Sequence, residues 1–277
     1  MVADAASLAS RLHAMHLAER LPAGSLALAA FAGLQDSAPR AGLLSLHARV
    51  EGIGPDAWEH PSLAQVWGPR GAAWLIPADA VAAFTLGRLP RDPEDKRQLE
   101  RIADDALAGA PDPYRRGGAA TGRYLIRWDA RTTTLIPREP PDVDPEDARR
   151  DLASRYLAWF GETMRPRFAH WAGVSEEDAV ETLRYIQPSQ LPDGPPATGV
   201  RLLPQFDPYM YGEEVPTSPH REIVGTLLVD GQMSGIWARQ QSKVTVRPRS
   251  RRHIDRIEQE AYSMAGPIGR PISLTIA

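Results

Sequence analysis

The stretch at residues 25–52, SLALAAFAGLQDSAPRAGLLSLHARVEG, predicts two helical segments joined by a short polar elbow. Apolar side chains recur at helical spacing on both sides of it, at Leu26, Leu28, Ala29, Phe31, Ala32 and Leu34 and again at Leu43, Leu44, Leu46 and Val50. Pro39 suits the first turn of the second helix. The elbow, residues 35–39, therefore presents Gln35, Asp36 and Ser37 where two packed helices meet. A simpler role is also open, in which Asp36 or Ser37 only caps the second helix.

Composition limits the chemistry of the whole chain. Its 277 residues are 43% hydrophobic, which is enough for a sizeable core. The absence of cysteine excludes disulfides, thiolate nucleophiles and every cysteine-ligated metal site. We expect no metal and no cofactor, so the reactive groups must be oxygen and nitrogen atoms. The sequence has no long uncharged apolar run and no signal-peptide pattern, so we expect a cytoplasmic protein without membrane association.

The net charge of −3 does not by itself indicate a nucleic-acid-binding protein, but the charges are unevenly distributed. Residues 139–151 are rich in acids, whereas Lys243, Arg247, Arg249, Arg251 and Arg252 cluster near the C-terminus. A local basic face can bind phosphates on a mildly anionic protein. Such a run is also typical of an ordinary solvated surface.

Hairpin and helix signals follow one another along the chain. Short strands are predicted at 63–67 and 72–76 and at 124–128 and 132–136. A further hairpin is predicted over 223–237, around the turn Asp230-Gly231, with a third strand at 243–247. Helices are predicted at 5–20, 78–86, 94–108, 146–160, 163–171, from the cap Ser175 onward, and at 251–264, with a last strand at 271–276. Helices followed by a hairpin form the order of a winged helix-turn-helix.

Five blocks of the sequence resemble the winged-helix DNA glycosylase family of AlkZ and YcaQ. They are GLQDSAPRAGLLSLHARVEG at 33–52, RGAAWLIPA at 70–78, RYLAWFGETMRPRFAHWAGVS at 155–175, LLPQFDPYM at 202–210 and VDGQMSGIW at 229–237. The resemblance covers roughly residues 26–264. It implies hydrolysis of the N-glycosidic bond of alkylated purines or crosslinks in DNA, in repair or in self-resistance to alkylating agents.

The resemblance also implies a catalytic site at the elbow. Relatives carry two Gln side chains, or a Gln and an Asp, spaced i, i+2; these orient a water and face the positively charged sugar of the transition state. Gln35 matches the first of them, and Ser37 stands at the second position. Asp36 compensates for the shorter serine if its carboxylate can turn toward the same water. Ala72 and Trp74 replace a Thr and a His of the family pattern, so altered or lost catalysis is the alternative.

Candidate phosphate contacts come from the hairpins, the basic loop at 113–123 and the basic segment near the C-terminus. We predict DNA binding by Arg70, Arg115, Arg116, Arg123, Arg165, Arg167, Lys243, Arg247, Arg249, Arg251 and Arg252. For Arg165 and Arg167 a plain surface role is equally open. Phe206 and Asp207 belong to the tail motif of the family, and for Asp207 a turn-forming role is the alternative.

The sequence thus predicts an α+β protein, mainly helical, of tandem winged helix-turn-helix modules with a C-terminal antiparallel sheet. We expect a first winged-helix module at 1–90, a helix with a second hairpin at 91–140, a further winged-helix module at 146–190, and a β-rich element with a final helix at 200–277. The predicted function is a monomeric, glycosylase-like protein acting on double-stranded, alkylated DNA. The alternative is a non-catalytic winged-helix DNA binder, acting as a lesion sensor or transcriptional regulator.

Overall fold

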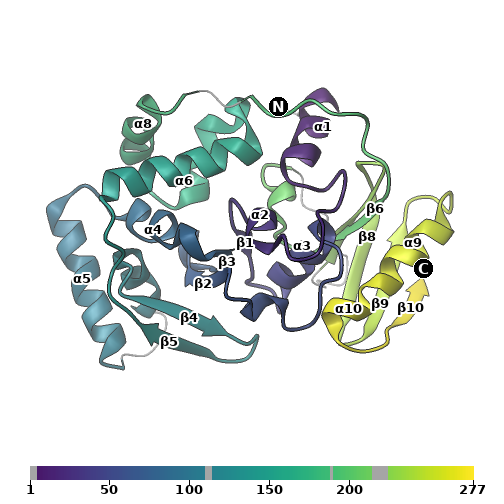
Figure 1. Cartoon of the computed structure of the whole chain (residues 1–277), viewed down its shortest axis with the longest axis horizontal. Coiled ribbons are helices and arrows are strands. Elements are labelled where there is room, and N and C mark those ends of the chain that lie inside the picture. Colours follow the sequence, from purple (N-terminus) through teal and green to yellow (C-terminus); the bar gives the residue numbers. More distant parts are fainter. Residues whose placement is uncertain (1–4, 110–113, 188–189, 214–223) are drawn as a thin grey trace. The chain divides into compact units, whose positions relative to one another are not determined.

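A computed structural model describes residues 5–109, 114–187, 190–213 and 224–277 (Figure 1). The chain forms two compact units. Unit 1 combines residues 1–29, 34–60 and 192–277, and unit 2 combines residues 30–33 and 61–191. Within the described ranges, none of the helices is both long and apolar enough to cross a membrane.

Unit 1 contains a five-stranded sheet in the order β10-β9-β8-β7-β6. Its strands are β6 (Val200–Leu203), β7 (Val224–Val229), β8 (Gln232–Gln240), β9 (Lys243–Pro248) and β10 (Ser273–Ile276). Neighbouring strands from β6 to β9 are antiparallel, and β10 runs parallel to β9. The β7–β8 turn confirms the predicted hairpin, because Asp230 and Gly231 both have the positive φ that a type I′ turn needs.

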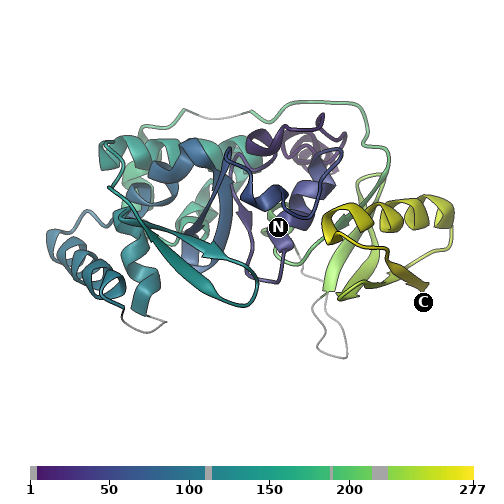
Figure 2. The ribbon, with the colours of Figure 1, turned by 60° about the horizontal axis from the view of Figure 1, so that its bottom comes forward.

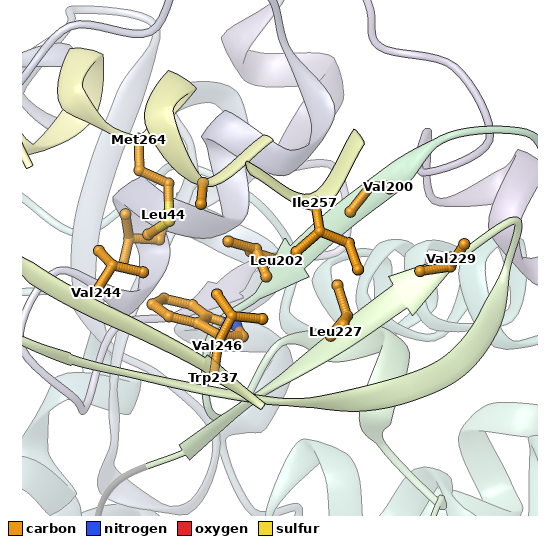
Figure 3. Packing of buried hydrophobic residues seen from close by; sticks show 11 residues of the cluster. Leu44, Val200, Leu202, Leu227, Val229, Trp237, Val244, Val246, Ile257 and Met264 are labelled. Atoms are coloured by element: carbon orange, nitrogen blue, oxygen red, sulfur yellow. The ribbon is translucent and has the colours of Figure 1, made fainter. Parts of the chain in front are cut away.

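Helices cover one face of this sheet. They are α3 (Ala41–Arg49), α9 (Ile254–Ser263) and α10 (Ala265–Ile268). Unit 1 also contains α1 (Ala5–Ala14), α2 (Leu26–Ala29) and the short extended segment β1 (Leu34–Gln35). Leu44 of α3 and Ile257 and Met264 from the C-terminal helical segment share a core with Trp237 of the sheet (Figure 3). This core joins residues that are far apart in sequence, so the N-terminal and C-terminal segments fold as one body.

Unit 2 contains two hairpins and a set of helices (Figures 1 and 2). The hairpins are β2–β3 (Leu63–Trp67, Ala73–Pro77) and β4–β5 (Tyr124–Trp128, Thr133–Pro137). The helices are α4 (Val81–Phe84), α5 (Pro93–Leu107), α6 (Pro145–Phe160), α7 (Phe168–Ala172) and α8 (Glu176–Arg184). The side chain of Gln65 links the hairpins, since it accepts from the Trp128 N–H at 2.9 Å and donates to the Trp128 carbonyl at 3.3 Å.

Several predicted helices are shorter than the periodicity indicates. The segment before the elbow is helical only at Leu26–Ala29, because Gly33 turns the chain with φ +80 and Gln35 lies in the extended segment β1. A Cβ at position 33 would lie 2.8 Å from Trp74 and Phe84, so the close packing there requires glycine. The prediction of two packed helices flanking Gln35 is therefore wrong on its N-terminal side. The helix predicted at 5–20 likewise ends at Ala14, and much of 163–171 is a 3-10 helix.

Candidate functional site

The elbow exposes two of its three predicted site residues. Gln35 is partly exposed and Ser37 is exposed. The Gln35 side-chain amide donates from Nε2 to the Ser37 Oγ at 3.1 Å. The amide and the hydroxyl, spaced i, i+2, thus form one polar pair that a ligand can reach.

Asp36 is buried, with 1% of its surface exposed. Its Oδ1 accepts the backbone N–H of Gly42 at 2.8 Å, in the first turn of α3. Arg40 precedes the helix in a left-handed conformation, φ +64, and its side chain makes no cap. The carboxylate of Asp36 therefore satisfies a helix N-terminal donor, which is the capping role that the sequence left open. Turning it toward a water beside Ser37 would break this bond.

The motif Phe206-Asp207 forms a turn anchored to the same helix. Asp207 is buried and accepts two hydrogen bonds from the Arg49 guanidinium, at 2.7 and 2.8 Å, and one from Ser45 Oγ at 2.7 Å. Asp207 Oδ1 also accepts the Tyr209 N–H at 3.0 Å, as in the turn-forming role proposed from sequence. Phe206 itself is 46% exposed, with φ +67.

Helix α3 therefore brings together two motifs that are far apart in sequence. The elbow is bonded to it at Gly42 and the Phe206-Asp207 turn at Ser45. Three residues of α-helix advance by about 4.5 Å along the axis. Both motifs thus attach to the same short helix within unit 1, the elbow in its first turn and the Phe206-Asp207 turn at its middle and at its last residue.

A basic groove lies on the outer face of the unit 1 sheet. It has a volume of about 550 Å³ and is lined by Ala238, Arg239, Gln240, Lys243, Thr245, Arg247 and Thr275. Lys243, Thr245 and Arg247 alternate along β9 with the core residues Val244 and Val246, so all three point away from the core. Within the described ranges, no carboxylate forms an ion pair with Lys243 or Arg239.

Arg239 lines this groove and also contacts the elbow, from the side of the sheet on which its partner Val244 lies. Its Nη2 donates to the Pro39 carbonyl at 3.1 Å and its Nη1 to the Gln241 carbonyl at 3.0 Å. Burial and the charge of Arg270 both lower the pKa of Arg239. The guanidinium of Arg40, the residue that follows Pro39, lies 3.8 Å from the ring centre of Trp58. Neither arginine was predicted as a site residue. Arg239 is isolated in a strand, and nothing near it in sequence indicates its hydrogen bond to the Pro39 carbonyl.

The remaining predicted cations of unit 1 lie beyond the groove lining. Arg249, Arg251 and Arg252 are exposed in the loop that follows β9. Arg249 donates to the carbonyl of Met233 at 3.5 Å. These side chains are accessible to a phosphate, but the structure assigns them no shared cavity.

The predicted cations of unit 2 have protein partners of several kinds. Arg123 pairs with Asp104 at 2.6 Å, and the hydrogen bond to Asp104 is the main factor that raises its pKa. Arg165 binds the Leu183 and Ile186 carbonyls at 2.7 and 3.0 Å. Arg116 lies over the Trp67 ring at 4.6 Å.

Three predicted cations remain in unit 2. Arg70 and Arg167 are exposed, and Arg70 lies 3.5 Å from the His170 imidazole. The side chain of Arg115 lies outside the described residues. The partners of Arg123 and Arg165 favour structural roles for these two arginines.

Trp74, which replaces a polar residue of the family pattern, belongs to the core of unit 2. Its Nε1 donates to the Pro69 carbonyl at 3.2 Å, and its ring packs against Phe84 and Trp171 at 6.0 and 5.8 Å. A second cavity in this unit, about 1160 Å³, is lined by acids as well as arginines, including Asp92, Asp95, Glu176, Glu177, Asp178 and Glu181. Those carboxylates make it less suited to a polyanion than the basic groove is.

Comparison with known proteins agrees with the resemblance seen in the sequence. No protein-family model matches this chain, and no curated protein matches it significantly. The solved structure of the DNA glycosylase AlkZ from Streptomyces sahachiroi does match, over 100% of both chains, with a TM-score of 0.64 and 17% sequence identity. A match at this identity establishes the fold. The chain therefore has an AlkZ-like fold, in which helices and strands are mixed.

Proposed function

We propose that this protein binds double-stranded DNA and hydrolyses the N-glycosidic bond of alkylated purines, with Gln35 and Ser37 as the reactive pair. The observation that carries the proposal is the exposed Gln35–Ser37 pair, held at the start of α3 in a chain with the fold of a DNA glycosylase. Tandem winged-helix modules would supply the framework for DNA binding. The basic groove, adjoining the elbow through Arg239, supports a path for the phosphate backbone.

The proposed reaction needs little from the protein. A purine alkylated at N3 or N7 is cationic, so breaking its bond to the sugar returns the electron pair to the base and neutralises it. Water then adds its oxygen to the sugar carbon and releases a proton to solvent. Gln35 and Ser37 would orient that water and stabilise the cationic sugar by their dipoles. Asp36 would act by positioning, because its carboxylate fixes the elbow on α3.

Catalysis is tested with a duplex that contains 7-methylguanine. Wild-type protein is expected to produce alkali-labile sites above a heat-inactivated control, and Gln35→Ala is expected to reduce their rate by about 10- to 1000-fold, as for loss of one stabilising dipole. Gln98→Ala, on the exposed face of α5, is the matched control and should retain the wild-type rate. An active Gln35→Ala protein would reject the proposed site.

A non-catalytic DNA binder is the second candidate function. Ser37 is shorter than an amide or a carboxylate, Asp36 is turned into the protein, and Trp74 is committed to the core. These three observations favour binding without hydrolysis. The assay for alkali-labile sites separates the two candidate functions. A non-catalytic binder should bind duplex in a salt-dependent way and produce no such sites.

Binding is tested by fluorescence anisotropy of a labelled duplex over a range of salt concentrations. Lys243→Ala should weaken binding and reduce the magnitude of the slope of log K against log salt by about one. Lys96→Ala, on the exposed face of α5, is the matched control and should leave both unchanged. Absence of salt-dependent binding by the wild type would reject both candidate functions.

A further inference from the structure

The conformation of Phe206 is unusual for an aromatic residue. Its backbone is left-handed, with φ +67, while 46% of its surface is exposed. L-residues other than Asn and Asp adopt this region at a cost in free energy, because Cβ crowds the backbone, whereas glycine has no Cβ. An aromatic side chain can offset that cost by being buried, but Phe206 keeps nearly half of its surface in contact with solvent.

The turn around Phe206 is one in which glycine would be the usual choice. The Asp207 N–H donates to the Pro204 carbonyl at 3.2 Å, which closes a four-residue turn with Phe206 in its third position. A positive φ at that position alone is typical of a type II turn, where glycine is favoured. The backbone therefore does not explain the phenylalanine, and an explanation must come from the ring.

Buried interactions hold this turn in place. Asp207, the residue after Phe206, is bonded to Arg49 and Ser45 of α3, and the side chains of Arg49 and Asp207 are both 0% exposed. Pro208 follows directly and restricts the chain further. The strained position is thus fixed to a rigid element, as at functional sites where the surrounding structure maintains an unfavourable conformation.

We infer that Phe206 is a base-stacking residue, whose exposed ring receives a nucleobase unstacked from bound DNA. The inference rests on the proposed DNA binding and adds a contact to it. The turn and the elbow are bonded to the same helix, at Ser45 and Gly42, so the two attachments lie about one helical turn apart along α3. A phenyl ring stacks on any base without needing a hydrogen bond, and a cationic alkylated purine gains attraction to its π face.

The test uses a duplex with 2-aminopurine opposite an abasic site, because an unstacked 2-aminopurine fluoresces strongly and a ring stacked on it quenches it. Anisotropy of a second label measures binding of the full-length protein. Phe206→Ala should weaken binding by about 5- to 100-fold and abolish the quenching by protein, as expected for the loss of one aromatic stack. Phe206→Trp should retain both.

Two further variants keep the test decisive. Tyr262→Ala removes an aromatic ring of similar exposure, 55%, from α9, and should leave binding and quenching unchanged. Phe206→Gly removes the ring while suiting the positive φ, so it should fold at least as well as the wild type and bind like Phe206→Ala.

The outcomes separate this inference from the proposed function. If the wild type binds duplex and both ring-deleted variants bind and quench as it does, the stacking role is overturned while DNA binding stands. If the wild type binds no DNA at any salt concentration, the proposed function and the inference fall together.

Discussion

The ion pair between Arg49 and Asp207 is buried, with two parallel hydrogen bonds of 2.7 and 2.8 Å. A buried pair of this kind adds little net stability over apolar residues of the same size, because desolvating two charges is costly. Removing one partner is different, since the other charge remains in the interior without compensation. The pair therefore acts mainly as a specific connection between α3 and the Phe206-Asp207 turn.

Asp207→Asn should accordingly lower the free energy of unfolding by about 3–5 kcal/mol. Urea denaturation monitored by circular dichroism measures this. The exposed pair Glu94–Arg97 provides the control, since Glu94→Gln should change stability by less than about 1 kcal/mol. Equal effects of the two substitutions would show that Arg49 is solvated in the folded state.

The His47 imidazole determines part of the pH dependence of stability. Burial is the main factor that lowers its pKa, to about 3 from 6.5, and the charges of Arg20 and Arg201 lower it further. As pH falls below about 6.5, the unfolded chain takes up a proton that the folded protein does not. Stability is therefore fully present above pH 6.5 and is lost as pH decreases toward 3.

Between about pH 6.5 and about pH 4.5, wild-type protein should lose about 2 kcal/mol more stability than His47→Gln, which cannot take up this proton. Glutamine retains a polar group for the Ser263 hydroxyl, which lies 3.0 Å from the imidazole. Denaturation curves at a series of pH values measure the difference. Parallel stability curves for the two proteins would contradict the assignment.

Single residues were the hardest to predict from sequence. Gln35 and Ser37 were predicted as exposed polar groups, and the structure places them so. The partner of Asp207 could not be predicted, because Arg49 lies 158 positions away and no local pattern connects them. Arg239 was missed for the same reason. Their reactive roles stay predictions.

At the scale of elements, the first turn of helix α3 is capped by Asp36, a residue that precedes the helix in sequence. Asp36→Ala removes the acceptor for the Gly42 N–H and should lower the free energy of unfolding by about 1–2 kcal/mol. Asp36→Asn keeps an acceptor oxygen and should lose less than half as much. Ser37→Ala, exposed and next in sequence, is the control; a larger loss there than at Asp36 would contradict the capping role.

Hairpins were predicted well because their determinants are local. β2 and β4 have the predicted bounds, and the predicted Asp230-Gly231 turn connects β7 and β8. The helix before the elbow was predicted poorly, since its apolar periodicity continues through residues 30–34 while the chain leaves the helix at Ala29. The packing of Gly33 against Trp74 and Phe84 is tertiary, so the periodicity could not show it.

At the scale of the whole molecule, unit 1 is discontinuous. Its N-terminal residues share their core with residues 200–264, as Leu44 does with Val200 and Trp237. The sequence predicted separate modules at 1–90 and 200–277, because composition and linkers describe neighbours along the chain. The division into four modules stays a prediction, whereas the structure divides the chain into two compact units.

Cutting the chain after residue 191 should unfold the N-terminal part of unit 1 and spare unit 2. In full-length protein, trypsin should cleave slowly at Arg49 and Arg149, whose side chains are 0% and 6% exposed. In the fragment 1–191, cleavage at Arg49 should become fast, while Arg149 stays protected. Mass spectrometry of timed digests measures both, and adding fragment 192–277 should restore protection at Arg49. Protection at Arg49 without that fragment would contradict the shared core.

The separation of Arg49 from Asp207 has a consequence for biosynthesis. At translation speeds of roughly 5–20 residues per second, 158 positions correspond to a delay of roughly 8–30 seconds. During that interval the nascent chain carries an uncompensated guanidinium and an apolar α3 surface, while residues 61–191 emerge and can fold first. The ribosome thus completes residues 61–191 before Asp207 can pair with Arg49, and a chain that stops before residue 207 would leave the Arg49 guanidinium without this carboxylate.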